Sequence, residues 1–330
     1  MQDAVISQIS ALAVLPNRYL LKLDPKTDYF LIHQPYLGML RLSVNGASGF
    51  KTPKKSGISG LINKIVKDVP DCYTQVKLGS EIWRTSIKKD TLDPEWNETH
   101  DFLITDREQV IQFIVKDDDV RDDDVLGSTT IDIKQLLDNP SSALRLSPAP
   151  SNDGQSPTLN ISSKMYSLTK DLGSMSSQAP SMDNLSLKDG ATNIRGLLTI
   201  LLSRATDLPN PNAKPLSAIK PSASITFLGK NYDTAQQIYT QGYDILNPSF
   251  DVPFEVQITE EVLKGQGIEG LANERFGIKL LNDGVVVGES IVAFEEVLKA
   301  DGIHTMEADV GAGAKLRVGF TLQGIAEDNM

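Results

Sequence analysis

Short apolar runs in which every second residue is hydrophobic recur along most of this 330-residue chain. In the run over 110–116, Ile111, Phe113 and Val115 fall on one face, which is the period of a half-buried strand. A second run over 127–133 follows directly after an acidic loop. Short runs of this kind, separated by turn-forming residues, predict an antiparallel β-sandwich.

One set of eight strands is predicted between residues 36 and 168. A connection rich in Lys and Gly follows the first strand, and a helical turn is expected at 134–138. The expected strands are 38–44, 72–78, 82–87, 99–104, 110–116, 127–133, 143–146 and 158–166.

The N-terminal stretch departs from this pattern. Apolar residues recur at helical spacing over 1–14, and Pro16 disfavours a helix that continues up to it. Residues 19–23 and 29–32 are strand-like. The stretch therefore predicts a short helix followed by extended chain, and it is too short to be a domain of its own.

The β pattern restarts at Gly196 as a repeat of the first set. Residues 38–50 align with 196–208, and a Leu-Asp-Pro segment at Leu92 aligns with a Leu-Asn-Pro segment at Leu246. An ordered repeat of about 130 residues is too long for a solenoid unit and indicates two copies of one domain. We therefore predict an all-β fold with two antiparallel eight-stranded sandwiches.

The repeat sets the expected domain boundaries. The two domains are expected at residues 36–168 and 194–325, with a tail at 326–330. Residues 169–193 contain Ser, Asp and Gly without any period, so we expect a flexible linker there.

The composition is globular, with 40% hydrophobic and 23% charged residues, and the formal net charge is −11. This charge argues against nucleic acid as the main partner, because phosphate binding needs a basic surface. No apolar run approaches the about 20 residues that span a bilayer, and the N-terminus lacks the pattern of a signal peptide. The single cysteine, Cys72, cannot form an internal disulfide and is expected to be a buried apolar residue.

Charge is distributed unevenly along the chain. Residues 51–90 hold nine Lys or Arg and four Asp or Glu, whereas residues 91–124 hold three and twelve. Six of these acids are aspartates within the eight residues 117–124. Carboxylates this close repel one another unless water, cations or basic partners screen them. The loop is therefore either a solvated acidic turn or a cation site.

Catalytic motifs are absent from the sequence. We find no Gly-x-Ser-x-Gly, phosphate loop or dinucleotide fingerprint. The three histidines are scattered, with no Cys or carboxylate at metal-binding spacing. No catalytic residues are predicted, and the chain is not expected to be an enzyme.

Three segments of the first copy resemble the motifs of C2 domains. They are Pro-Asp-Cys-Tyr at 70–73, Leu-Asp-Pro-Glu-Trp at 92–96, and the acidic loop that ends at 124–127. Residues 1–44 resemble the junction between the lipid-transfer (SMP) domain and the first C2 domain of extended synaptotagmins and tricalbins. Residues 1–35 are therefore expected to be the end of an SMP-type domain plus a linker. Members of this family tether the endoplasmic reticulum to the plasma membrane and move glycerolipids, with calcium regulating some of their C2 domains.

The resemblance implies a set of calcium ligands in the first domain, in which Asp123 can substitute for Asp124. A further acid of the family's first loop has no clear match, so the implied cage is incomplete and weak, in the range of about 10⁻⁵–10⁻⁴ M. Calcium is not expected in the second domain, where Pro221 and Ser222 replace an acid and the third loop keeps only Asp283. The implied ligands are Asp71, Asp117, Asp119, Asp123 and Asp124.

The resemblance also implies binding to anionic phospholipid through Lys77, Lys88 and Lys89, although an ordinary solvated face is the alternative. The expected location is the cytoplasmic face of membranes, at contacts between the endoplasmic reticulum and the plasma membrane. The second domain is a candidate for binding protein partners. Two other hypotheses stay open: a calcium-independent protein-interaction module, and accessory domains of an enzyme whose chemistry lies in another region.

Overall fold

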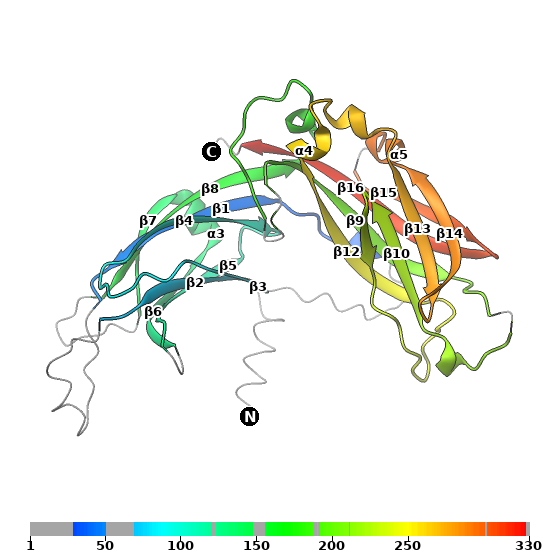
Figure 1. Ribbon diagram of the computed structural model, residues 1–330, viewed down its shortest axis with the longest axis horizontal. Helices are drawn as coiled ribbons and strands as arrows, with labels where there is room; N and C mark the ends of the chain where they lie inside the picture. Colours follow the sequence, from blue (N-terminus) through cyan, green and yellow to red (C-terminus); the bar gives the residue numbers. More distant parts are fainter. Residues whose placement is uncertain are drawn as a thin grey trace. The chain divides into compact units, whose positions relative to one another are not determined.

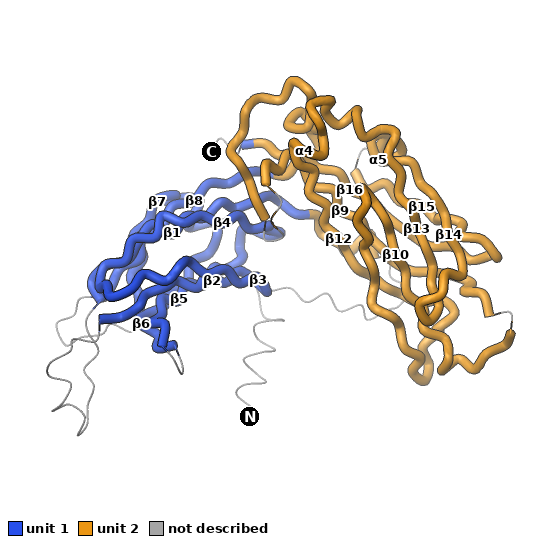
Figure 2. The backbone as a smooth tube through the Cα atoms, in the orientation of Figure 1, with its two compact units in different colours: residues 1–20, 36–167, 327–330 blue, residues 21–35, 168–326 orange. Residues whose placement is uncertain are grey.

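The computed structural model describes residues 29–50, 69–119, 123–147, 156–187, 190, 192–210, 212–300 and 302–327. These residues form two compact units (Figure 2). The first is built from residues 36–167 and Glu327, and the second from residues 29–35 and 168–326. Each unit is a β-sandwich with its own buried core.

The first unit contains eight strands in two layers (Figure 1). One layer has the strand order β3-β2-β5-β6, and in the other the order is β4-β1-β8-β7. A short helix, α3 (Ile133–Asp138), follows β6. The strands are β1 (Gly38–Ser48), β2 (Cys72–Leu78), β3 (Glu81–Arg84), β4 (Glu95–Ile104), β5 (Val110–Asp117), β6 (Asp124–Asp132), β7 (Ser141–Arg145) and β8 (Thr158–Thr169).

Alternation along the strands explains how the two layers pack. Leu40, Leu42 and Val44 of β1 are fully buried, and they belong to the same hydrophobic core as Phe113 and Val115 of β5. Side chains on opposite faces of a strand alternate, so the residues between them point away from this core. Burial of these alternate positions is the main source of stability for a sandwich of this size.

The second unit repeats this architecture with the layers β11-β10-β13-β14 and β12-β9-β16-β15. Its core contains a stack in which the ring centroids of Phe227 lie 4.3 Å from Phe276 and 5.3 Å from Phe294. The strands are β9 (Ile194–Thr206), β10 (Pro221–Phe227), β11 (Lys230–Asp233), β12 (Ser249–Thr259), β13 (Arg275–Asn282), β14 (Val285–Ala293), β15 (His304–Gly311) and β16 (Ala314–Glu327).

The predicted fold class is confirmed, since each unit is an eight-stranded antiparallel sandwich. One local prediction is wrong: Tyr29–Ile32 is a helix, α2, and not a strand. Tyr29 and Phe30 are adjacent, and both are buried against Leu201 of the second unit. A strand would send adjacent side chains to opposite faces, whereas a helical turn keeps both in contact with one surface.

The helix expected over 1–14 lies outside the described residues. In the described part of the chain, no helix has both the length and the apolar composition needed to cross a membrane.

The segment expected to be a flexible linker runs along the second unit and packs against it. Met175 and Leu185 are 0% exposed, and Met175 belongs to the core of the second sandwich. The hydroxyl of Ser174 donates to the carbonyl of Arg195 at 2.7 Å and accepts from the N–H of Ile325 at 2.8 Å. This part of the segment is therefore held by buried contacts, which differs from a linker without structure of its own.

Candidate metal and lipid site

The strand register brings three of the predicted calcium ligands together at one end of the strands in the layer β3-β2-β5-β6. This end of the layer is called the acidic edge below. Cys72 of β2 lies opposite Asp117 of β5, and Asp117 lies opposite Asp124 of β6. Asp71 directly precedes Cys72, and its carbonyl accepts a hydrogen bond of 2.9 Å from the N–H of Asp118. Asp71, Asp117 and Asp124 are therefore neighbours on three adjacent strand ends.

Main-chain amides hold two of these carboxylates. The N–H of Asp71 donates to Oδ1 of Asp117 at 2.7 Å, and Oδ1 of Asp71 accepts from the N–H of Asp90 at 2.9 Å. Hydrogen bonds to a charged carboxylate are stronger than neutral ones. They fix the side-chain directions of Asp71 and Asp117 at the strand edge.

Asp123 is oriented differently from its neighbour Asp124. The hydroxyl of Tyr73 donates to Oδ2 of Asp123 at 2.5 Å, and this bond lowers the pKa of Asp123 below its ordinary value. Burial, followed by the bond to Asp123, raises the pKa of the Tyr73 phenol to about 12. The guanidinium carbon of Arg84 lies 5.5 Å from the centroid of the Tyr73 ring. Asp123 is thus attached to the outer face of the sheet.

The five predicted ligands do not converge on one point. Asp119 is exposed beyond the end of β5. Within the described ranges, which omit 51–68 and 120–122, no three His, Cys, Asp or Glu side chains form a group that could hold a metal ion. The carboxylates are the hard oxygen donors that calcium prefers. Their chemistry fits calcium, but the described side chains as arranged do not enclose an ion.

The single cysteine lies beneath this edge. Cys72 is 0% exposed, and its thiol donates to the carbonyl of Thr91 at 3.4 Å. Burial, followed by the negative charges of Asp117 and Asp71, raises the pKa of the Cys72 thiol to about 12. The prediction of a buried cysteine is confirmed, and its thiol stays protonated at neutral pH.

Lys77 lies on the outer face of the layer β3-β2-β5-β6, because its neighbours along β2 enter the core. Arg84 lies opposite Gln75 on this face, and Lys116 lies opposite Tyr73. Lys77, Arg84 and Lys116 together are called the outer basic face below. Arg84 belongs to the basic segment over 51–90 but was not among the expected lipid-binding residues, and Lys116 was not considered for lipid. Each directly follows a core-facing residue, Trp83 in β3 or Val115 in β5, and this one-residue offset is the signal that could have found them.

The other two predicted lipid-binding lysines lie at the acidic edge and not on the outer basic face. Lys88 and Cys72 exchange two main-chain hydrogen bonds of 2.8 Å each. Lys89 is the next residue and is exposed, and Asp90 follows it. The predicted lysines therefore separate into Lys77 on the sheet face and the pair Lys88 and Lys89 beside Asp71.

The second unit keeps the hydrogen bonds of this edge but changes its charges. The N–H of Lys220 donates to Oδ1 of Asn282, and the N–H of Asp283 donates to the carbonyl of Lys220, both at 2.9 Å. Lys220 thus takes the place of Asp71, and Asn282 takes the place of Asp117. The expected replacement of this acid by Pro221 and Ser222 was wrong by one position. The ammonium of Lys220 also lies 3.3 Å from Oδ1 of Asp283. Here a lysine side chain supplies the positive charge at the strand edge.

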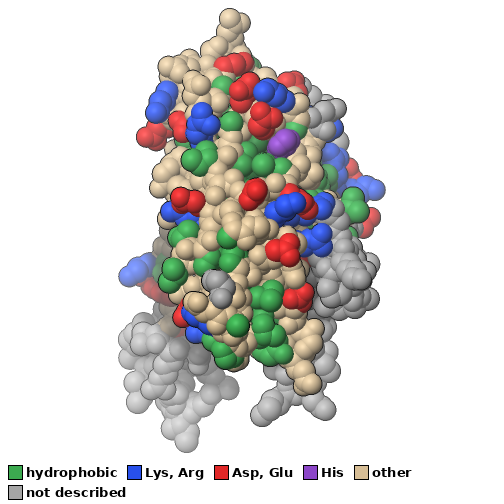
Figure 3. Space-filling view, turned by 90° about the vertical axis from the view of Figure 1, so that its right-hand side faces the viewer, with side chains coloured by type: hydrophobic (Ala, Val, Ile, Leu, Met, Phe, Trp, Pro, Cys, Tyr) green, Lys and Arg blue, Asp and Glu red, His purple; other side chains and the backbone are tan. Residues whose placement is uncertain are grey.

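The same end of the second unit exposes apolar side chains. Val285 and Val286, which follow the turn at Asp283, are 66% and 45% exposed. Figure 3 shows hydrophobic side chains gathered in the lower part of one face, with acidic and basic side chains interspersed over the rest. Mixed charge of this kind gives no strongly basic surface for anionic lipid on that face.

Residues 38–147 match the C2 domain family. Extended synaptotagmin-1 from Pongo abelii is 31% identical over 136 residues, which are 40% of this chain and 12% of that protein. Extended synaptotagmin-2 from Mus musculus is 24% identical over 273 residues, which are 78% of this chain and 30% of that protein. The chain thus spans less than a third of the length of these relatives.

Solved structures share the fold of both units. A structure of the two adjacent C2 domains of extended synaptotagmin 2 covers 96% of this chain with a TM-score of 0.61 and 16% identity, and 99% of that structure is matched. Its calcium-bound form covers 90% of this chain with a TM-score of 0.58 and 17% identity, and it is matched over its whole length, 100%. Residues 38–147 therefore match the C2 domain family, both units have the C2-type fold, and the chain is similar to the extended synaptotagmins.

Proposed function

We propose that the chain is a calcium-regulated, phospholipid-binding protein that acts as a membrane-contact-site tether or as the regulatory part of a lipid-transfer protein. The observation that carries the proposal is the juxtaposition of Asp71, Asp117 and Asp124 on three adjacent strand ends. The fold it shares with the calcium-bound pair of C2 domains supports the calcium part. The lipid-transfer part is supported by a structure of extended synaptotagmin 2 that contains the SMP domain and both C2 domains. It covers 99% of this chain with a TM-score of 0.59 and 17% identity, and 65% of it is matched.

Electrostatics explains why such an edge would respond to a cation. Three carboxylates on neighbouring strand ends repel one another, and the repulsion is stronger near a low-dielectric protein surface than in bulk water. Calcium takes six to eight oxygen ligands, whereas three carboxylates supply six only if each binds through both of its oxygens. Phosphate oxygens of lipid headgroups are suited to the remaining positions. Binding of the cation and binding of an anionic membrane would then strengthen each other.

The outer basic face supplies a second attraction for anionic lipid. Each well-placed Lys or Arg near a negatively charged leaflet contributes about 1 kcal/mol. Lys88 and Lys89 add positive charge next to the acidic edge, where it favours the same surface. A protein that uses both regions would act at the cytoplasmic face of membranes, at contacts between the endoplasmic reticulum and the plasma membrane.

Sedimentation with vesicles tests this function. The full chain is mixed with vesicles of phosphatidylcholine and phosphatidylserine, and the pelleted fraction is measured with calcium and with chelator. We expect calcium to increase pelleting, and we expect Asp117→Asn combined with Asp124→Asn to abolish the increase. Glu108→Gln with Asp138→Asn removes two exposed charges away from this edge and should leave the increase unchanged. Equal pelleting with calcium and with chelator would contradict calcium regulation.

A calcium-independent protein-interaction module is the alternative function. The observation in its favour is that the described acids form no group that could hold a metal ion. A ligand that binds only the native state increases the free energy of unfolding, by about 2.7 kcal/mol when its concentration is one hundred times its Kd, and this raises the melting temperature. An unchanged melting temperature in millimolar calcium, together with calcium-insensitive pelleting, would favour the alternative.

A further inference from the structure

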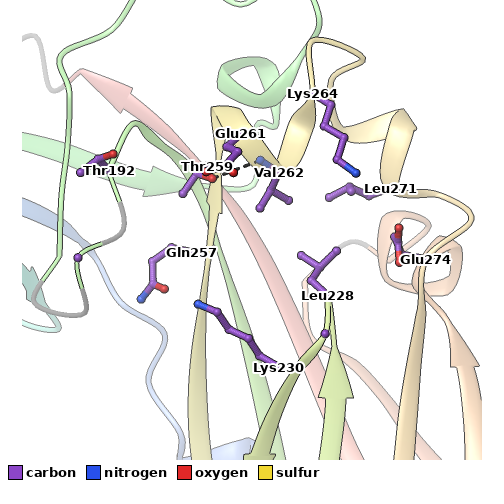
Figure 4. A pocket seen from close by; sticks show the side chains of 12 residues that line it. Thr192, Leu228, Lys230, Gln257, Thr259, Glu261, Val262, Lys264, Leu271 and Glu274 are labelled. Atoms are coloured by element: carbon purple, nitrogen blue, oxygen red, sulfur yellow. Dashed lines mark hydrogen bonds between the residues drawn. The ribbon is translucent and has the colours of Figure 1, made fainter.

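A groove of about 670 Å³ opens on the second unit (Figure 4). It lies at the far end of β10 from Lys220, beside the turn that joins β10 to β11. Strand β12, the helices α4 (Glu260–Leu263) and η4 (Ile268–Leu271), and Gly190 and Thr192 of the segment before β9 supply its other walls. The proposed calcium and lipid functions do not use this groove.

Side chains fill the corresponding place in the first unit. Nε2 of His100 on β4 lies 2.9 Å from Oε1 of Glu81 on β3, and the His100 ring stacks on Trp83 at 5.3 Å between centroids. Lys230 holds the position of Glu81, since each residue pairs with the last residue of the preceding strand. Phe254 stands in the sequence position of His100. Phe254 keeps a ring contact, with its centroid 5.8 Å from that of Tyr232, but a lysine and a phenylalanine cannot form the bond that joins Glu81 to His100.

A longer connection builds the opposite wall of the groove. In the first unit, residues 105–109 join β4 to β5, and Oε1 of Gln109 accepts the N–H groups of Thr105 and Asp106 at 2.9 and 3.1 Å. In the second unit, residues 260–274 make the same connection and contain α4 and η4. The groove is thus a feature of the second copy that the repeat does not require.

The floor of the groove is apolar. Leu228, Val262 and Leu271 line it, and Leu271 is only 5% exposed. In Figure 4, Leu228 and Val262 project from opposite sides into the middle of the groove. An apolar floor beneath an open, polar mouth is suited to a single aliphatic side chain of a ligand.

The rim of the groove is charged. Lys230 extends beside Gln257 on one side, and Lys264 and Glu274 lie on the other (Figure 4). Neither lysine forms an ion pair within the described part of the chain. Glu261 and Glu274 also line the groove, but Lys230 is not paired with either of them, so its ammonium can receive an acidic group of a ligand.

Two edge strands border the groove. Among the described strands, β11 pairs with β10 alone and β12 pairs with β9 alone. The outer edge of such a strand presents N–H and C=O groups that an extended peptide can pair with. A lipid headgroup has no row of amides to match them, so the two edges favour a peptide as the occupant.

We propose that this groove binds an extended peptide with one aliphatic anchor, such as Leu or Met, and an acidic residue close to it in sequence. The anchor covers Leu228, Val262 and Leu271, and the acidic residue pairs with Lys230. Main-chain hydrogen bonds to the edge of β11 or β12 fix the direction of the peptide. The second C2 domain is then a peptide-docking module whose site is independent of the acidic edge of the first.

Peptide selection on the full chain tests the proposal. Random heptapeptides displayed on phage are selected against the wild-type chain, and the enriched peptides are synthesised with a fluorophore for polarisation measurements. We expect the enriched sequences to share an aliphatic residue near an acid. Their affinity should fall about tenfold in Lys230→Glu, which corresponds to about 1.4 kcal/mol. Lys279→Glu, an exposed change on β13 outside the groove, should leave the affinity unchanged.

A second variant separates loss of binding from loss of folding. Leu228 has a φ of 48°, in the left-handed region that favours glycine, so Leu228→Gly removes part of the floor without backbone strain. We expect this variant to unfold cooperatively and to bind the peptides more weakly. Failure of any peptide to enrich, or equal binding by wild type and Lys230→Glu, would overturn the proposal. The proposal would also be overturned if phosphatidylcholine vesicles displaced the peptides from the wild-type chain in the polarisation measurement, because the groove would then be assigned to lipid.

Discussion

Adjacent residues in the acidic loop have different chemical surroundings. Asp124 begins β6 opposite Asp117, whereas Asp123 accepts a hydrogen bond from the hydroxyl of Tyr73. The Tyr73 hydroxyl therefore decides where one of the six acids points, even though it belongs to another strand. It also links the acidic edge to Arg84 on the outer basic face, whose guanidinium covers the Tyr73 ring.

Removal of this hydroxyl should change the pH dependence of stability. The Tyr73 pKa rises from 10.0 to about 12 in the folded chain, so its contribution to stability is present below pH 10 and is lost as the pH rises towards 12. The lowered pKa of Asp123 has the opposite sign, since its contribution is lost as the pH falls through the folded pKa. We expect Tyr73→Phe to lose less stability than the wild type when the pH is moved from neutral to either the acidic or the alkaline extreme. Urea unfolding from about pH 3 to about pH 11 measures this, and parallel curves for the two proteins would refute it.

At the scale of elements, alternation along the sequence predicted the strands well. The run that contains Ile111, Phe113 and Val115 is β5, and these side chains are 0% exposed. The start of β6 was predicted at Gly127, but the strand begins at Asp124 because this residue pairs with Asp117. Strand register depends on contacts between distant segments, and a single sequence does not display them. For the same reason the sequence identified the acids without showing which of them meet.

The segment before β9 offers an element-scale test. A Cβ atom on Gly324 would lie 2.0 Å from the carbonyl oxygen of Asp171 and 2.9 Å from Oγ of Ser174. Gly324→Ala should therefore displace this segment and destabilise the second unit by about 1–3 kcal/mol. Gly277→Ala is the matched control, because its nearest neighbour would be 3.7 Å away. Urea denaturation measures both, and equal midpoints would show that the segment is not held in place by this contact.

Across the whole molecule, the two C2 folds differ more in charge than in architecture. The first has an acidic strand edge and the outer basic face, while the second has Lys220 in place of the first acid and a groove in place of the Glu81–His100 bond. The repeat made the second fold predictable. The groove of the second fold could not be predicted, because residues 260–274 differ from the first copy and form a wall only when packed against β11 and β12.

Salt dependence should reveal how much of membrane binding depends on the outer basic face. Lys77→Gln with Arg84→Gln removes two positive charges, so we expect about a thirtyfold loss of affinity for phosphatidylserine vesicles in chelator at low salt, from about 1 kcal/mol per charge. Lys134→Gln with Lys279→Gln removes the same charge elsewhere and should have a smaller effect. Titration at two salt concentrations measures this. An equal loss in both double variants would indicate that only overall charge matters.

The lysine at the strand edge of the second domain has a consequence for signalling. An ion in solution occupies its site according to its concentration and leaves at a finite rate, whereas the Lys220 ammonium is attached to the chain and cannot diffuse away. The positive charge of Lys220 is therefore present at that edge at every concentration of free cations. Under the proposed function, a change in calcium would alter the charge of the acidic edge of the first copy, while the lysine charge at the corresponding edge of the second stays constant.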